Sequence, residues 1–276
     1  MRPRQKPTVT EPRDLVWDRP VPAKRPAPGP LTRERIVRAA VALADKRGLE
    51  GVSLRKVAAK LNVGPMRIYG YTSTKEGLLE LMVDAVYGEI AEPPPIRLEW
   101  RDALRSVARR TREAAKSHTW FVDLLGGRVH LGPNALAHLE GSLAGLARNR
   151  GFADIDTALQ ALRIVNAYVV GAIRGDATEL RAELQTGMNE SAWQEATWPY
   201  LERVIATGRF PMIAKVVTEA RHPSPDAAFE TGLEWVIDGI AAALVKHERG
   251  KPQEARSRSR SKGRRRGVEG AAPTSK

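Results

Sequence analysis

The stretch from residue 53 to residue 71, SLRKVAAKLNVGPMRIYGY, decides how the first part of this chain folds. Asn62 and Gly64 are residue types that end a helix and turn the chain, and Pro65 suits the first position of a new helix. The stretch therefore predicts a helix of about eight residues, a short turn and a second short helix, which is the helix-turn-helix arrangement. The first helix has its apolar residues at helical spacing, at Leu54, Val57, Ala58 and Leu61.

The short second helix carries large side chains with polar ends. Arg67 could bond guanine through two hydrogen bonds or hold a phosphate, and the hydroxyls of Tyr69 and Tyr71 could reach phosphate oxygens. Lys75 stands at the start of the next helix, where backbone N–H groups also favour a phosphate. The alternative is that the apolar side chains of this helix only fill the core and that Arg67 is a solvated charge.

The rest of the chain also repeats apolar residues at three- and four-residue spacing, without a sustained two-residue alternation. We therefore predict an all-α protein, and its length suggests about two domains. The proline run 93–95 should separate residues 31–91 from the remainder of the chain, because helices end before proline. The expected helices are 32–47, 54–61, 75–90, 100–117, 118–126, 133–150, 154–175, 190–207 and 226–247.

The charge is distributed unevenly along the chain. The net charge of +13 suggests a polyanionic partner, either nucleic acid or an anionic membrane surface. Much of the excess lies in two segments predicted to be disordered, a Pro/Arg-rich arm at 1–30 and a basic tail at 249–276 with ten basic and two acidic residues. Residues 31–75 hold ten basic and three acidic residues. The folded part is thus expected to have a basic end and an acidic body.

Several classes of protein are disfavoured by what the sequence lacks. The chain has no Cys, which excludes a disulfide scaffold and a thiolate zinc site and suits a reducing cytoplasm. No apolar run reaches the roughly 18 residues of a membrane span, so no membrane partner is expected. His118, His130 and His138 are not at metal-ligand spacing with carboxylates, and no phosphate loop or serine nucleophile elbow occurs. We expect no metal, no cofactor and no enzymatic activity.

Residues 31–91 as a whole resemble the N-terminal domain of the TetR family of transcriptional regulators. The resemblance rests on a first helix that ends in Gly-Leu at 48–49, on SLRKVA, on LNVGP in the turn, on IYGY in the recognition helix and on STKEGLL after it. It implies a homodimer whose helix-turn-helix domain, 31–91, binds double-stranded operator DNA. It also implies that a small-molecule effector, not identified by the sequence, releases the DNA. Repression is the commoner mode in the family, and activation stays open.

The family's DNA contacts are carried over position by position. Residues 65–67 would read bases, Arg55 would contact bases or backbone, and the two tyrosines and the lysine would hold phosphates. Many relatives have a small Ser or Thr in place of Arg67 and a bulky residue in place of Gly70. Arg67 therefore suggests a half-site that contains G, and Gly70 puts the usual placement of the recognition helix in doubt. The expected DNA contacts are Arg55, Pro65, Met66, Arg67, Tyr69, Tyr71 and Lys75.

Residues 92–248 are expected to form the C-terminal regulatory and dimerisation domain. The stretch HTWFVDLLGGRVHLGPNALAHLEGSLAGL, residues 118–146, resembles one subgroup of that domain. Asn166 and Tyr168 interrupt an apolar run, and a buried polar group needs a partner, which could be a ligand, another helix or water. The candidates for an effector pocket are Trp120, Phe121, Leu124, His130, Asn134, Asn166 and Tyr168, although ordinary core positions would explain them as well.

The resemblance also suggests how DNA binding would be controlled. Helices 154–175 and 226–247 have wide apolar arcs, and in the family they form a four-helix bundle between two subunits; an ordinary buried helix pair is the alternative. A dimer would hold its recognition helices about 34–36 Å apart, and an effector acting on a hinge near 86–97 would change that spacing. A different function would be non-specific nucleic-acid or nucleoid binding through the basic tail.

Overall fold

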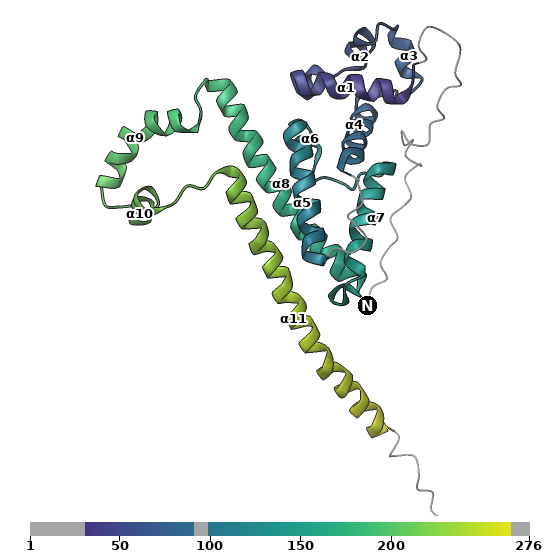
Figure 1. Ribbon diagram of the computed structural model, residues 1–276, viewed down its shortest axis with the longest axis vertical. Helices are drawn as coiled ribbons and strands as arrows, with labels where there is room; N and C mark the ends of the chain where they lie inside the picture. The colour runs from purple at the N-terminus through teal and green to yellow at the C-terminus, as the bar shows by residue number, and fades with distance from the viewer. Residues whose placement is uncertain (1–30, 91–98, 266–276) are drawn as a thin grey trace, which may run out of the picture.

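The computed structural model describes residues 31–90 and 99–265, with side chains up to residue 246. Helices and connecting turns account for these residues and no strand occurs among them, which confirms the all-α prediction. The predicted arm at 1–30, the proline run at 93–95 and the end of the tail lie outside the described residues. Figure 1 shows a small helical bundle at one end, a larger helical body, and a pair of helices that projects from that body.

The N-terminal bundle contains three helices and the start of a fourth, which packs against the first helix. The Thr32 hydroxyl accepts a hydrogen bond from the Arg35 N–H, and the Ser53 hydroxyl accepts one from the Lys56 N–H, so both helices begin at a capping side chain. Asn62 has φ of 53°, the left-handed conformation expected where a helix ends in a turn. The helices are α1 (Arg33–Arg47), η1 (Leu49–Gly51), α2 (Leu54–Lys60), α3 (Pro65–Tyr69) and α4 (Lys75–Ile90).

The second half of α4 reaches into the larger body, where it packs against both α5 and α7. A single helix therefore belongs to both parts of the molecule. α8 and α11 lie along the body, while α9 and α10 project from it (Figure 1). The elements are α5 (Trp100–Ser117), α6 (Phe121–Leu124), α7 (Pro133–Ala147), η2 (Arg150–Phe152), α8 (Ile155–Thr186), α9 (Glu190–Ala206), α10 (Pro211–Glu219) and α11 (Pro225–Arg265).

The structure differs from the predicted elements mainly in four places. The predicted helix 118–126 is reduced to the four-residue α6, Phe121–Leu124. α8 continues to Thr186, well beyond the predicted end at 175, and ends at Gly187 in the left-handed conformation. α10 was not predicted, although Pro211 stands at its first turn. α11 runs to Arg265, so the boundary predicted at residue 249 lies inside a helix. Residues 249–265 include eight Arg and Lys residues, which favour helix, and low complexity alone did not indicate this.

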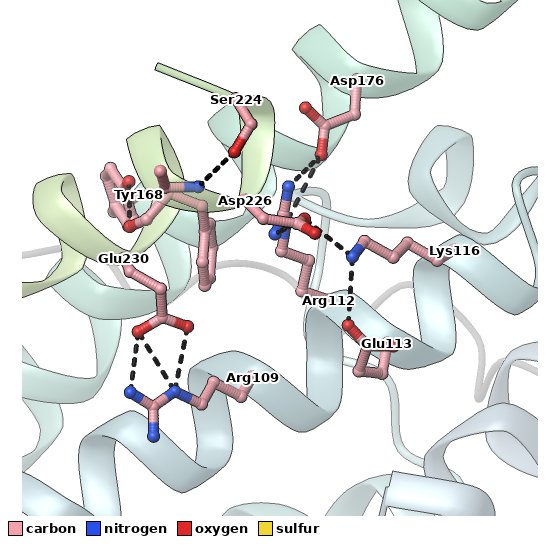
Figure 2. Close-up of polar contacts among 11 residues, drawn as sticks. Arg109, Arg112, Glu113, Lys116, Tyr168, Asp176, Ser224, Asp226 and Glu230 are labelled. Atoms are coloured by element: carbon pink, nitrogen blue, oxygen red, sulfur yellow. Dashed lines mark hydrogen bonds and ion pairs between the residues drawn. The ribbon is translucent and has the colours of Figure 1, made fainter.

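α5 and α11 run side by side and are joined by a row of ion pairs, which we call the charge ladder. The acidic residues of the ladder are spaced every four residues along α11, so they lie on one face of that helix. Figure 2 shows the part of the ladder around Arg109 and Arg112. The rungs are Arg101–Asp238 (3.6 Å), Arg105–Glu234 (2.6 Å), Arg109–Glu230 (2.7 Å), Arg112–Asp226 (2.7 Å) and Lys116–Asp226 (2.9 Å).

Arg112 differs from the other rungs because its side chain is only 5% exposed. Its guanidinium contacts Asp176 of α8 at 2.9 Å as well as Asp226 of α11, and it lies 4.4 Å from the centre of the Phe229 ring. Arg112 therefore ties three helices, α5, α8 and α11, together at one point (Figure 2). Burial opposes its charge, but the hydrogen bonds to both carboxylates outweigh that effect and raise its pKa.

Candidate DNA-binding surface and effector site

The recognition helix α3 presents side chains to solvent on one side and is anchored on the other. Ile68 is fully buried in the core, which fixes the helix on the bundle. Met66 is 80% exposed and Tyr69 is 40% exposed, and Pro65 and Arg67 are also exposed. The four expected contacts of this helix therefore lie on its solvent-facing part, where they are free to meet a ligand.

The other expected DNA contacts differ in their surroundings. Arg55 is exposed on α2, and Lys75 is partly buried at the first turn of α4. The Thr74 hydroxyl accepts a hydrogen bond from the Gly77 N–H, so Thr74 caps α4 beside Lys75. Lys75 consequently lies at a helix N-terminus, as predicted from the sequence.

Tyr71 requires a correction, because its hydroxyl is used inside the bundle. Its side chain is buried, and the hydroxyl donates to the backbone carbonyl of Leu31. A tyrosine hydroxyl has one proton, and a phosphate oxygen could only accept it. We therefore assign Tyr71 to holding the start of α1 against the end of α3 rather than to the phosphate contacts.

The start of α7 is fixed to α4 by Asp84, a residue that the sequence did not single out. The Asp84 carboxylate is buried and accepts hydrogen bonds from the backbone N–H groups of Asn134 (3.0 Å) and Ala135 (2.9 Å). The Asn134 side-chain amide donates to the Asp84 backbone carbonyl at 3.1 Å. Burial raises the pKa of Asp84 in spite of these bonds. Asn134 is thus a structural partner of α4, not a free pocket group.

Four rings meet between α4, α6 and α7, and we call them the ring cluster: Tyr87, Phe121, His130 and His138. The centre of the Tyr87 ring lies 5.6 Å from that of Phe121, 6.0 Å from His130 and 5.5 Å from His138. His130 Nε2 lies 3.2 Å from the carbonyl oxygen of Leu124. The sequence predicted Phe121, Leu124 and His130, but missed Tyr87 and His138, which sit on amphipathic helices as ordinary core residues would.

Two members of the ring cluster are uncharged near neutral pH. Burial raises the pKa of Tyr87, so its phenol stays protonated near neutral pH. Burial, followed by the nearby Arg110, lowers the pKa of His138, so its imidazole is neutral there. The cluster is therefore an aromatic contact between α4, α6 and α7 that also carries hydrogen-bonding groups.

The remaining pocket candidates are not members of the ring cluster. Trp120 is buried, and its indole Nε1 donates to Asp45 of α1 at 2.6 Å. The Tyr168 hydroxyl donates to the carbonyl of Phe229 in α11 at 2.8 Å, and Asn166 is exposed on α8. The structure therefore brings together only some of the predicted pocket residues. Over the described part of the chain, no three His, Asp or Glu side chains converge as a metal site, and no helix is long and apolar enough to span a membrane.

Comparison with known proteins shows which family shares this architecture. Residues 36–82 match the family model of bacterial regulatory proteins of the tetR family, and residues 92–244 match the model of the tetracyclin repressor-like C-terminal domain. The chain is 37% identical to the HTH-type transcriptional repressor DrrR1 of Streptomyces coeruleorubidus over 86% of this chain and 87% of the relative. It is 30% identical to the class C tetracycline repressor protein of Escherichia coli over 76% of this chain and 90% of the relative.

The solved structures agree with the sequence relatives. The TetR family protein ActR of Streptomyces coelicolor, in complex with actinorhodin, superposes with a TM-score of 0.67 at 27% identity and covers 78% of this chain and 98% of its own. These relatives are transcriptional regulators rather than enzymes. The helix-turn-helix bundle, the helical second domain and both family models lead to one conclusion. This chain belongs to the TetR family of transcriptional regulators.

Proposed function

We propose that this protein is a cytoplasmic transcriptional repressor that binds a palindromic operator as a homodimer and leaves it when a small molecule binds. The observation that carries the proposal is the α3 surface, where Pro65, Met66, Arg67 and Tyr69 are exposed around the buried anchor Ile68. An exposed arginine on a rigid recognition helix is suited to guanine in the major groove. Arg55 and Lys75 flank this surface and would hold the DNA backbone.

A second copy of the chain is the partner that the exposed apolar residues favour. Trp235 of α11 is 74% exposed, and Ile164 and Leu180 of α8 are 41% and 42% exposed. Large apolar side chains exposed on helices are typical of subunit interfaces. In α9 and α10 the structure buries no residue, and Trp193, Trp198, Tyr200, Phe210 and Met212 are exposed. A second copy of the chain, related by a two-fold axis and packed on α8 and α11, would cover some of these exposed apolar side chains.

The ring cluster supports an effector that contains aromatic rings. Tyr87 and Phe121 would contact its faces and edges, and the imidazoles of His130 and His138 would bond its oxygen groups. ActR, which this chain resembles over 78% of its length, has been solved with actinorhodin bound. Because the cluster touches α4, an effector there would act on the helix that also carries the DNA-binding bundle.

Selection of binding sites from random DNA, with the full chain at physiological salt, tests the proposal. We expect a two-fold-symmetric consensus whose half-sites contain G, and a complex with two copies of the chain. A set of selected sequences without any consensus would contradict binding to a specific operator. It would favour the second candidate, non-specific binding through the basic residues from 249 onward.

Removal of residues 249–276 separates these two functions. The ten basic residues in this segment would give affinity that falls steeply with salt and does not depend on sequence. If the truncated chain keeps the operator consensus, the segment only adds electrostatic affinity. If all DNA binding is lost while the helical fold persists, the segment itself is the DNA-binding element.

A further inference from the structure

His118, which directly follows α5, joins the effector domain to the DNA-binding bundle. Its Nδ1 lies 2.7 Å from Oδ1 of Asp45 in α1, and its Nε2 lies 3.1 Å from Oε2 of Glu89 near the end of α4. The Trp120 indole donates to the same Asp45 oxygen at 2.6 Å. The His118 side chain is only 12% exposed, so the contact is largely shielded from water.

The two ring nitrogens of His118 both face carboxylate oxygens, which makes the contact depend on a proton. A neutral imidazole has one N–H and one lone pair, so it can donate to Asp45 or to Glu89 but not to both. The other carboxylate would then face a lone pair. Only the imidazolium ion donates to both carboxylates and carries the charge that they attract.

The position of this contact links it to both functional regions. Asp45 lies in the last turn of α1, the helix that packs against α2 and α4 in the bundle. Trp120 directly precedes Phe121 of the ring cluster, and the two rings meet edge to face at 6.3 Å. A change at the ring cluster is therefore one residue away from the bond that holds α1.

We infer that His118, in its protonated form, is a latch that holds the DNA-binding bundle in the orientation seen here, so that operator binding weakens as this proton is lost. The inference rests on the proposed function only where it concerns the operator. The latch itself, a proton-dependent contact between α1, α4 and the α5–α6 turn, is a property of the free protein.

The surroundings of His118 fix the direction of the pH dependence. Burial disfavours the charged form, but the hydrogen bonds to Asp45 and Glu89 outweigh it and raise the pKa of His118 above its ordinary value of 6.5. A group with a raised pKa in the folded state stabilises the fold fully below its unfolded pKa and loses this effect as the pH rises through the folded pKa. The latch is therefore fully closed below about pH 6.5 and opens as the pH rises through the raised pKa of His118.

The other charged groups near His118 in sequence are engaged elsewhere. Lys116 of α5 contacts Glu113 at 3.2 Å and Asp226 at 2.9 Å. Asp123 of α6 pairs with Arg181 of α8 at 2.6 Å. Among the residues that the structure describes, Asp45 from α1 and Glu89 from α4 are the carboxylates that contact the imidazole. The turn before α6 contributes the indole of Trp120, which does not titrate.

The first test measures the latch without DNA. The chain has no Cys, so spin labels placed by R38C on α1 and E179C on α8, both exposed positions, report the distance between the two parts. We expect a narrow distance distribution at pH 6 and a broader one at pH 8.5, with H118Q broad at both values. H222Q, at an exposed histidine remote in sequence, is the matched control and should behave as the unaltered protein.

A nuclear magnetic resonance titration and an operator measurement complete the test. The His118 ring proton, assigned by its absence in H118Q, should titrate with a midpoint above 6.5, and E89Q, at a carboxylate 57% exposed, should lower that midpoint without unfolding the chain. Operator affinity, measured on the selected consensus, should fall about threefold to tenfold from pH 6 to pH 8.5, and H118Q should remove this dependence.

The outcomes separate the latch from the proposed function. Equal distance distributions at both pH values, or a midpoint that E89Q leaves unmoved, would overturn the latch whether or not an operator is found. A pH-dependent distance without any operator consensus would support the latch and contradict the repressor. If H118Q binds the operator with the unaltered protein's pH dependence, the latch does not control DNA binding.

Discussion

The α3 surface and the region around the ring cluster use their side chains in opposite ways. On α3, the polar ends of Arg67 and Tyr69 are exposed. Around the ring cluster, Asn134 is bonded to Asp84 and Trp120 to Asp45, although the sequence suggested both as ligand contacts. A surface that reads DNA must keep its polar groups free until DNA binds. A regulatory domain instead uses its polar groups to join helices, so that a small molecule can act on DNA binding by changing these contacts.

The largest effect should come from the tightest joint, where α7 meets α4. A Cβ atom at Gly132 would lie 2.1 Å from the Asp84 carboxylate, so G132A must displace the acceptor of two backbone N–H groups. We expect the free energy of unfolding in urea to fall by about 2–4 kcal/mol. Gly127 has open space around it, so G127A is the control. Equal losses in the two variants would contradict the prediction, because the loss of stability could then not be assigned to the contact between Asp84 and the start of α7.

A slightly smaller loss of stability is expected at Arg112. R112M removes a buried cation from Asp176 and from the face of Phe229, and urea unfolding should report a loss of about 2–3 kcal/mol. Arg109, whose side chain is 52% exposed, makes a similar pair with Glu230 in solvent. R109M should therefore cost at most about 1 kcal/mol. The reverse order would mean that exposure does not govern the strength of these rungs.

On α3, by contrast, substitution should change DNA binding and leave stability alone. R67A is expected to weaken operator binding by about 1–3 kcal/mol, measured by fluorescence anisotropy, and to relax the preference at one base pair. The control is R203A, an exposed arginine on α9. If R67A weakened binding equally on all DNA sequences, Arg67 would contact phosphate rather than a base.

The smallest effects should come from two tyrosines that are near each other in sequence but differ in burial. Y71F removes the buried hydrogen bond to the Leu31 carbonyl, so it should lower the unfolding free energy by about 1 kcal/mol. Y69F removes a hydroxyl on a residue 40% exposed, so it should leave stability unchanged and weaken operator binding by at most about 1 kcal/mol. A stability loss in Y69F alone would reverse the roles assigned to the two residues.

The sequence was most informative where the deciding contacts are local. The cap at Ser53 and the left-handed Asn62 are set by neighbouring residues, so the helix-turn-helix could be predicted from the sequence. The joint between Asp84 and Asn134 spans fifty positions. Helical periodicity says which face a residue occupies but not which helix that face meets, so this joint could not be predicted. The same limit hid the burial of the Tyr71 hydroxyl against Leu31, forty residues away.

The four-residue repeat of the charge ladder has a consequence for how α11 is held. If α11 slid by one helical turn along α5, Arg101 would meet Glu234 and Arg105 would meet Glu230, so most rungs would again join opposite charges. The charge ladder therefore fixes the antiparallel orientation of α11 against α5, but it is compatible with more than one register of α11.

The register is fixed instead by the fit of one ring against a glycine. The Tyr168 hydroxyl bonds the Phe229 carbonyl, and it would lie 2.3 Å from a Cβ atom at position 232, so only glycine admits the ring there. Moving α11 by one turn would bring Ala228 or Val236 to that place, and both carry a Cβ. The lack of a side chain at position 232 thus fixes the register of α11, which the regular spacing of the charges alone does not determine.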